Sequence, residues 1–116
     1  MTNFAKGEAA ETMACAALVQ DGFVILGRRR RTALGEIDIV AATPELLVFA
    51  EVKCRPDLHR AAAALGPRQQ SRLIAAAEVL LAEHPDWARE ASRFDVILVD
   101  AGGRVRRIAD AFRQMA

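Results

Sequence analysis

Apolar residues near the start of the chain recur at helical spacing. A stripe at positions i, i+3, i+4, i+7 and i+8 is formed by Ala10, Met13, Ala14, Ala17 and Leu18. This spacing turns one apolar face toward a core and predicts a helix over residues 4–21, which Gly22 ends. A second helical stretch covers residues 67–83, with Pro67 in its first turn, where the N–H that proline lacks has no helical partner.

Runs of β-branched and other apolar residues predict the strands. They cover residues 23–26, 36–42, 46–53 and 94–100, with a short last strand over 104–108 and a terminal helical turn over 110–114. The first strand runs into four consecutive arginines, at positions 28–31, and a turn that ends at Gly35. Pro44 lies between the second and third strands at a position suited to a type I turn, so these two strands form a hairpin. This order predicts an α/β fold in which helices flank a mixed sheet.

The composition is that of an ordinary globular protein. The 116 residues suffice for a single domain, 53% of them are apolar and 27% charged, and the net charge is +1. A nucleic acid must therefore be bound by a local basic patch, because the molecule as a whole carries no strong field. The sequence has no apolar run of about 18 residues and no leader pattern, so we expect a cytoplasmic protein with no membrane partner.

Cysteine and histidine offer no metal site. Cys15 and Cys54 stand far apart, and neither they nor His59 and His84 show the spacing of zinc ligands. We therefore expect two separate reduced thiols and no metal bound by these four side chains.

The predicted hairpin gathers four charged residues. With a four-residue loop centred between Pro44 and Glu45, residues whose numbers sum to 89 face each other, so Asp38 opposes Glu51 and Glu36 opposes Lys53. Alternation places all four on one face of the sheet. The opposite face takes Ile37, Ile39, Val48, Ala50 and Val52. A three- or five-residue loop would instead send Asp38 and Glu51 to opposite faces.

Two readings of this charged cluster stay open on spacing alone. In the first, Glu36–Lys53 and Asp38 with a nearby arginine are cross-strand ion pairs at a solvated sheet end, worth under about 1 kcal/mol each. In the second, the carboxylates form a divalent-metal site, since Mg²⁺ takes hard oxygen ligands from one or two carboxylates and from water. The neighbouring strands are so apolar that such clustering is costly without a compensating ligand.

The motifs of the chain resemble those of a nuclease superfamily. Gly35-Glu36-Ile37-Asp38, followed by Glu51-Val52-Lys53, is similar to the signature of PD-(D/E)XK nucleases. The closer resemblance is to the YraN-like family of small bacterial predicted endonucleases, related in fold to archaeal Holliday-junction resolvases. It extends over most of the chain, through the stretch from Glu11 to Phe23, the stretch from Pro67 to Leu73, and Arg93-Phe94-Asp95-Val96. The resemblance implies a restriction-endonuclease-like α/β fold.

The same resemblance assigns roles to individual residues. Asp38 and Glu51 would bind Mg²⁺ or Mn²⁺, with the carbonyl of Val52 as a possible third ligand. Lys53 would hold the phosphate or orient the attacking water. Glu11 would complete the site from the first helix, and its position at the rim of the apolar stripe agrees with that role.

Two further acids and three departures from the family pattern qualify this assignment. Glu8 lies opposite the apolar stripe and is expected to be solvated, and Glu36 is a candidate auxiliary ligand. This chain has Gln69 where the family usually has a lysine, Arg29 where it has an asparagine, and Ala10 for a glycine of the opening motif. Gln69 removes a positive charge near the expected site, which puts phosphate binding in question but not metal binding.

The arginine run also has two readings. It is either a solvated strand edge that discourages aggregation or a contact for the phosphate backbone. Alternation predicts that Arg29 and Arg31 share one face and that Arg28 and Arg30 share the other. Trp87 is expected to anchor the core or a loop rather than stack on bases. The candidate nucleic-acid-binding residues are Arg29, Arg31, Arg55, Arg68, Gln70 and Arg72.

These observations favour a metal-dependent nuclease that hydrolyses phosphodiester bonds in DNA, including branched DNA. One alternative is a nucleic-acid-binding module on the same fold that does not cleave. Another is a structural partner in a larger complex. Cutting both strands of a duplex or junction requires two sites, which makes a homodimer plausible.

Overall fold

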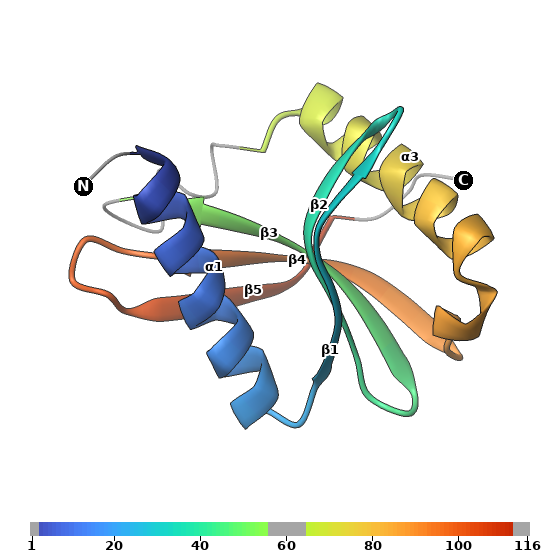
Figure 1. Cartoon of the computed structure of the whole chain (residues 1–116), viewed down its shortest axis with the longest axis horizontal. Helices are drawn as coiled ribbons and strands as arrows, with labels where there is room; N and C mark the ends of the chain where they lie inside the picture. Colours follow the sequence, from blue (N-terminus) through green and yellow to red (C-terminus); the bar gives the residue numbers. More distant parts are fainter. Residues whose placement is uncertain (1–2, 56–64, 113–116) are drawn as a thin grey trace.

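The computed structural model describes residues 3–55 and 65–112, so Pro56 and His59 lie outside the described residues. The elements in chain order are α1 (Asn3–Gln20), β1 (Val24–Thr32), β2 (Gly35–Ala42), β3 (Leu46–Cys54), α3 (Pro67–Glu83), the 3₁₀ turn η1 (Pro85–Trp87), β4 (Ala91–Val99) and β5 (Val105–Phe112) (Figure 1). Neither of the two helices is long and apolar enough to cross a membrane, as judged on the described residues.

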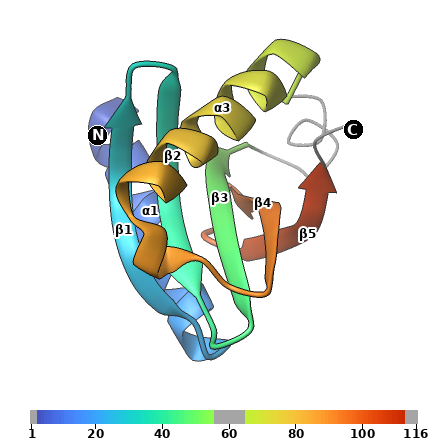
Figure 2. The same ribbon diagram turned by 90° about the vertical axis from the view of Figure 1, so that its right-hand side faces the viewer.

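The five strands form one mixed sheet in the order β1-β2-β3-β4-β5. Three neighbouring pairs are antiparallel, and β3 pairs with β4 in parallel. A parallel pair needs a long connection, and α3 lies within the connection here. Helix α1 packs on one face of the sheet and α3 on the other (Figure 2). The predicted α/β fold is therefore confirmed.

Two apolar clusters hold the helices to the sheet. On the α3 side, Val40, Ala42, Leu47 and Phe49 pack with Leu73, Ala76, Leu80 and Trp87. On the α1 side, Ile39, Ala41, Val48, Ala50 and Ile97 pack with Ala14 and Leu18. Strands β2 and β3 are thus buried on both faces, which explains their nearly continuous apolar sequence. Trp87 is part of the core, as predicted.

The end of the chain differs from the prediction. Residues 110–112 belong to β5 and not to a helical turn, and residues 113–114 lie outside the described part. Asp110 has a left-handed backbone (φ 53°), and the β4–β5 register shifts between Phe94 and Val96. Beyond this irregularity Phe112 is buried and stacks on Phe94, with 4.8 Å between ring centroids. Burial of that ring favours an extended strand over a local helical turn.

Candidate functional site

The β2–β3 hairpin has the predicted register. Its pairs run from Ala42–Leu47 to Ile39–Ala50, and the residue numbers of every pair sum to 89. At the next position the side chain of Asp38 bonds to the neighbouring strand, because its Oδ2 accepts the N–H of Val52 at 2.8 Å. Asp38 therefore lies in the opening where β2 and β3 separate, with its carboxylate fixed against β3.

Glu51 lies beside Asp38 and is only 9% exposed. Burial raises the pKa of Glu51 to about 7, and the negative charge of Asp38 contributes to that shift. Burial also raises the pKa of Asp38, although the hydrogen bond from the Val52 N–H acts in the opposite direction. Two adjacent carboxylates that are removed from water repel each other, and a cation bound between them would relieve that repulsion.

Lys53 supplies the nearest ammonium group. Its Nζ lies 3.3 Å from Glu51 Oε1, and its side chain is 17% exposed. The ion pair expected between Glu36 and Lys53 is not formed, since Glu36 instead accepts a 3.1 Å hydrogen bond from Arg31. The two strands have already separated at Glu36, so this residue turns to its β1 neighbour, with which it is paired in the sheet. Glu36 is thereby held at the surface by an arginine.

Glu11 approaches from α1, as predicted, and is 8% exposed. Its Oε1 accepts a 2.9 Å hydrogen bond from Arg29 Nε, and Arg28 Nη2 lies 4.0 Å from the same oxygen. The negative charge of Glu11 contributes to the raised pKa of Asp38, which places Glu11 near the carboxylate pair. Glu8 is exposed, in agreement with the prediction for that residue.

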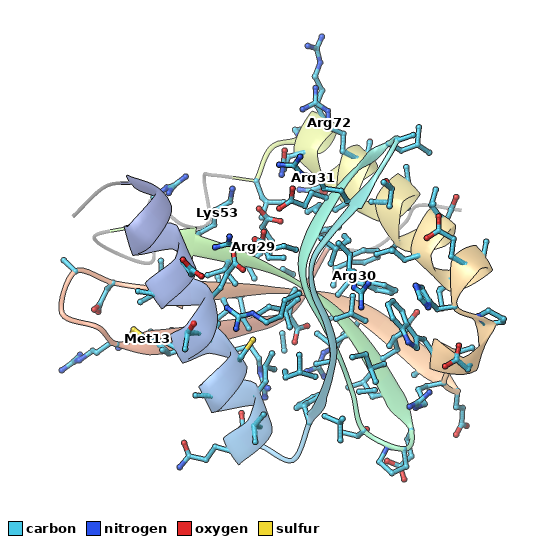
Figure 3. All side chains as sticks on the ribbon, in the orientation of Figure 1. Met13, Arg29, Arg30, Arg31, Lys53 and Arg72 are labelled. Carbon is cyan, nitrogen blue, oxygen red and sulfur yellow. The ribbon has the colours of Figure 1, made fainter. Side chains whose placement is uncertain are left out.

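The backbone of β1 is irregular at Arg29, and this overturns one prediction. Arg29 has a left-handed backbone (φ 49°) and lies opposite Asp38, between the pairs Arg28–Ile39 and Arg30–Ile37. Because of this irregularity Arg28 and Arg29 both reach Glu11, whereas Arg30 lies over the Trp87 ring at 5.8 Å (Figure 3). Arg28 and Arg30 were expected to share a face but lie on opposite ones.

Ile37 in β2 departs from its predicted face in the same way. It packs in the α3-side cluster, whereas its expected companions Ile39, Val48, Ala50 and Val52 pack on the α1 side. The change falls between Ile37 and Ile39, at Asp38. Both strands of the β1–β2 hairpin therefore exchange faces at the Arg29–Asp38 position.

The remaining candidate residues lie at the end of β3 and in the first turns of α3. Arg68 and Arg72 are exposed in the first turns of α3, and Arg55 donates a hydrogen bond to the carbonyl of Cys54. The start of β2 touches α3, because a Cβ added to Gly35 would lie 3.1 Å from the carbonyl oxygen of Arg72. Gln70 has a structural contact, since its Nε2 donates to the carbonyl of Leu65 at 3.1 Å.

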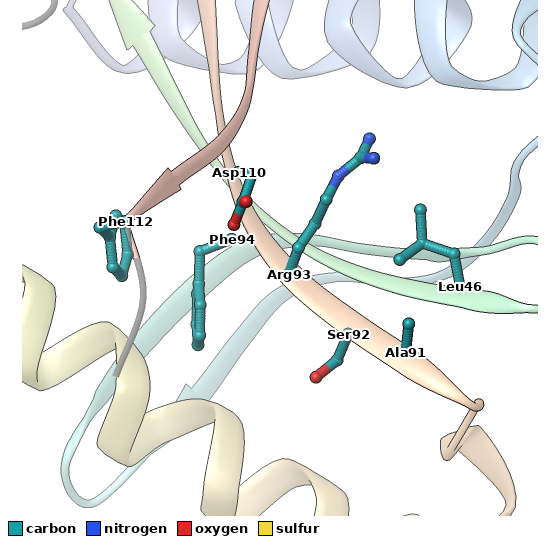
Figure 4. A pocket seen from close by; sticks show the side chains of 7 residues that line it. All are labelled: Leu46, Ala91, Ser92, Arg93, Phe94, Asp110 and Phe112. Atoms are coloured by element: carbon teal, nitrogen blue, oxygen red, sulfur yellow. The ribbon is translucent and has the colours of Figure 1, made fainter. Parts of the chain in front are cut away.

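A second charged cluster was not predicted. Asp95 is completely buried and accepts hydrogen bonds from Arg93 Nε at 2.8 Å, Arg93 Nη2 at 3.1 Å and the Asp110 N–H at 2.9 Å. Arg93 and Asp110 line an open pocket of about 510 Å³ together with Phe94 and Phe112 (Figure 4). The only sequence signal was the i, i+2 spacing of Arg93 and Asp95, which places both on one face of a strand.

The donor set suits a hard divalent cation. Within residues 3–55 and 65–112, no three acidic, histidine or cysteine side chains converge closely enough to enclose an ion as they stand. Asp38 and Glu51 converge, while Arg29 holds Glu11. Mg²⁺ is commonly bound by one or two carboxylates and completed by water and phosphate oxygens, so the Asp38–Glu51 pair fits it without a third acid. The backbone N–H of Val52 donates to Asp38, and the carbonyl of the same residue stays the predicted third ligand.

Comparison with known proteins gives consistent matches to one family. A family model described as "Uncharacterised protein family UPF0102" matches residues 10–99. A UPF0102 protein of Granulibacter bethesdensis is 60% identical over 107 residues, which cover 92% of this chain and 68% of that protein. UPF0102 proteins of Acidiphilium cryptum and Azorhizobium caulinodans are 47% and 50% identical, over 93% of this chain and 84% and 82% of their own lengths.

Proposed function

Because the chain belongs to the UPF0102 family, whose description assigns no activity, we propose its function from the chemistry of its own residues: metal-dependent hydrolysis of phosphodiester bonds in DNA. The observation that carries this proposal is the Asp38–Glu51 pair. Glu51 is buried and Asp38 is half-buried, desolvation raises the pKa of each, and Lys53 lies 3.3 Å from Glu51 at the mouth of the strand opening. A divalent cation and a phosphate would together satisfy all three groups.

In this proposal Asp38 and Glu51 hold Mg²⁺ or Mn²⁺ through carboxylate oxygens, with the Val52 carbonyl as a third candidate ligand. The bound ion would polarise a phosphoryl oxygen and lower the pKa of a water molecule. Lys53 would donate to the phosphoryl oxygens and stabilise the negative charge that develops on them. Its pairing with Glu51 already orients the ammonium group beside the ion-binding acids.

Arginine side chains would bind the remainder of the nucleic acid. Arg31, Arg68 and Arg72 are exposed, and a guanidinium group fits phosphate oxygens through two parallel hydrogen bonds. We propose that such backbone contacts, rather than base contacts, supply most of the affinity. Affinity for DNA should then decrease steeply with salt concentration, because counterions are released on binding.

The decisive experiment is a cleavage assay with and without Mg²⁺ or Mn²⁺. The substrates are linear, nicked and branched DNAs, with RNA as a further arm. Asp38→Ala should abolish cleavage. The control variant Asp86→Ala, which removes an exposed carboxylate in the η1 turn, should leave cleavage intact. Absence of metal-dependent cleavage by the wild-type protein on every substrate would refute the nuclease proposal.

One observation favours a second candidate function, a nucleic-acid-binding module that does not cleave. Arg29 already holds Glu11 at 2.9 Å, so within residues 3–55 and 65–112 only the carboxylates of Asp38 and Glu51 converge. Binding of DNA without turnover, at metal concentrations that saturate Asp38 and Glu51, would identify this function. Light scattering of the DNA complex would test the homodimer that cleavage of two strands implies.

A further inference from the structure

Arg29 is a candidate nucleic-acid-binding residue that contacts Glu11, one of the acids expected at the site. Its Nε donates to Glu11 Oε1 at 2.9 Å, and Arg28 approaches the same oxygen. Glu11 is nearly buried, with 11% of its side chain exposed, whereas the Arg29 side chain is 33% exposed. The acid is thus buried on α1, while Arg29, which lies opposite Asp38 in the β1–β2 register, is partly exposed.

The backbone of Arg29 directs its side chain to Glu11. A left-handed conformation is unfavourable for an arginine and persists only where the surrounding structure requires it. With regular alternation Arg28 and Arg29 would project to opposite faces, and only one of them could reach α1. The irregularity therefore brings a second guanidinium group to Glu11.

We propose that Arg29 is shared between Glu11 and a phosphate group of the nucleic acid, so that metal binding and nucleic-acid binding reinforce each other. The inference rests on the proposed function. A divalent cation held by Asp38 and Glu51 would attract the Glu11 carboxylate away from Arg29 and would repel the Arg29 guanidinium group. Arg29, once displaced, can form the two parallel hydrogen bonds that phosphate oxygens accept. Because coupling is reciprocal, DNA must strengthen metal binding by the same factor.

The first test needs no metal and no cleavage. Glu11→Gln removes the negative charge of the carboxylate that Arg29 contacts, so in EDTA this variant should bind a short DNA duplex about fivefold more tightly than Glu8→Gln. Glu8 lies on the same helix, is exposed, and loses the same charge on substitution, so it controls for net charge. Equal affinities of the two variants would overturn the inference.

The second test measures the coupling itself. In a Lys53→Met background, which keeps the DNA intact, Mn²⁺ should increase DNA affinity about fivefold or more. Adding Arg29→Asn should remove most of this increase, while adding Arg106→Asn, an exposed arginine on β5, should retain it. Asparagine is chosen because it tolerates the left-handed backbone. If Arg29→Asn does not fold, the comparison of Glu11→Gln with Glu8→Gln still decides the question.

The outcomes separate this inference from the proposed function. Retention of the full Mn²⁺ effect in Arg29→Asn would overturn the shared role of Arg29, while metal-dependent cleavage by the wild type would still support the nuclease. Lack of cleavage together with tighter binding by Glu11→Gln would refute the nuclease and support the exchange of Arg29 between Glu11 and phosphate.

Discussion

Two clusters of acidic side chains lie on the same sheet and differ in how their negative charge is compensated. Asp95 is completely buried and accepts three hydrogen bonds, two from one arginine and one from a backbone amide. Glu51 is buried beside the half-buried Asp38, and Lys53 is the nearby cation. The first cluster is compensated by its own hydrogen bonds, whereas the second, counted over the described part of the chain, sets two carboxylates against the one ammonium group of Lys53.

This difference separates a structural acid from a candidate functional one. A buried charge is tolerated when hydrogen bonds and a counter-charge replace water, and Asp95 meets that requirement. Burial without such compensation raises the pKa of Asp38 and of Glu51, so these residues are costly to the fold unless a ligand neutralises them. Substitutions in the two clusters should therefore have opposite consequences.

The largest effect on stability is expected at Asp95. Asp95→Asn removes the charge that holds Arg93 and should lower the free energy of unfolding by about 3 kcal/mol, since it breaks a buried ion pair. Urea denaturation measures the loss. Adding Arg93→Met should recover part of it, and Asp86→Asn at the surface should change little. A stable Asp95→Asn protein would remove the contrast between the clusters.

A large and selective effect on activity is expected at Lys53. Lys53→Met keeps the aliphatic stem and deletes the ammonium group, so single-turnover cleavage should fall about 10²- to 10³-fold while Mn²⁺ binding and much of the DNA affinity are retained. Quench-flow measurement with excess enzyme gives the rate, and calorimetric titration gives the Mn²⁺ affinity. Cleavage at the wild-type rate would leave Lys53 as a structural partner of Glu51 only.

The pH dependence of stability should reveal the uncompensated acid. Because the pKa of Glu51 is raised to about 7 from 4.5, the folded metal-free protein binds a proton that the unfolded chain releases between these pH values. Stability should therefore fall as the pH rises through this window, by up to about 3 kcal/mol, and become level above pH 7. Thermal melts from pH 4.5 to 8 measure this. Glu51→Gln should flatten the dependence of stability on pH. An unchanged slope in that variant would mean that another group causes the pH dependence.

The smallest effect on stability is expected for Asp38→Asn. The amide oxygen can still accept the Val52 N–H, and repulsion of Glu51 is relieved, so unfolding free energy should stay within about 1 kcal/mol of wild type or rise slightly. Metal affinity should decrease nevertheless. A thermal melt and a Mn²⁺ titration test the two parts, and unchanged Mn²⁺ affinity would exclude Asp38 as a ligand.

Much of this arrangement could be predicted from local sequence. The four-residue turn around Pro44 sets the β2–β3 register, which runs to Ile39–Ala50 and brings Asp38 to the strand that carries Glu51. The helical periodicity around Ala14 correctly places Glu11 at the rim of the face that packs on the sheet. These predictions succeeded because each depends on residues within one turn, hairpin or helix.

The irregular positions could not be predicted. A glycine or asparagine would have signalled a left-handed backbone, but the chain has Arg29 and Asp110 at these positions, and neither residue type indicates one strongly. The exchange of faces at Arg29 and the extension of β5 to Phe112 depend on contacts between distant elements. Asp95 was likewise missed as a buried acid, because its compensation by Arg93 and Asp110 requires the assembled sheet.

The exchange of faces at Arg29 and Asp38 also divides the β1–β2 hairpin into two halves that are packed differently. Its inner half, including Ile39 and Ala41, is held between both helices, whereas in the outer half Ile37 packs only with the α3 side and Gly35 touches Arg72. Arg29 and Asp38 thus mark a boundary in the sheet: the inner half of the hairpin is buried from both faces, and beyond the boundary apolar packing comes from the α3 face.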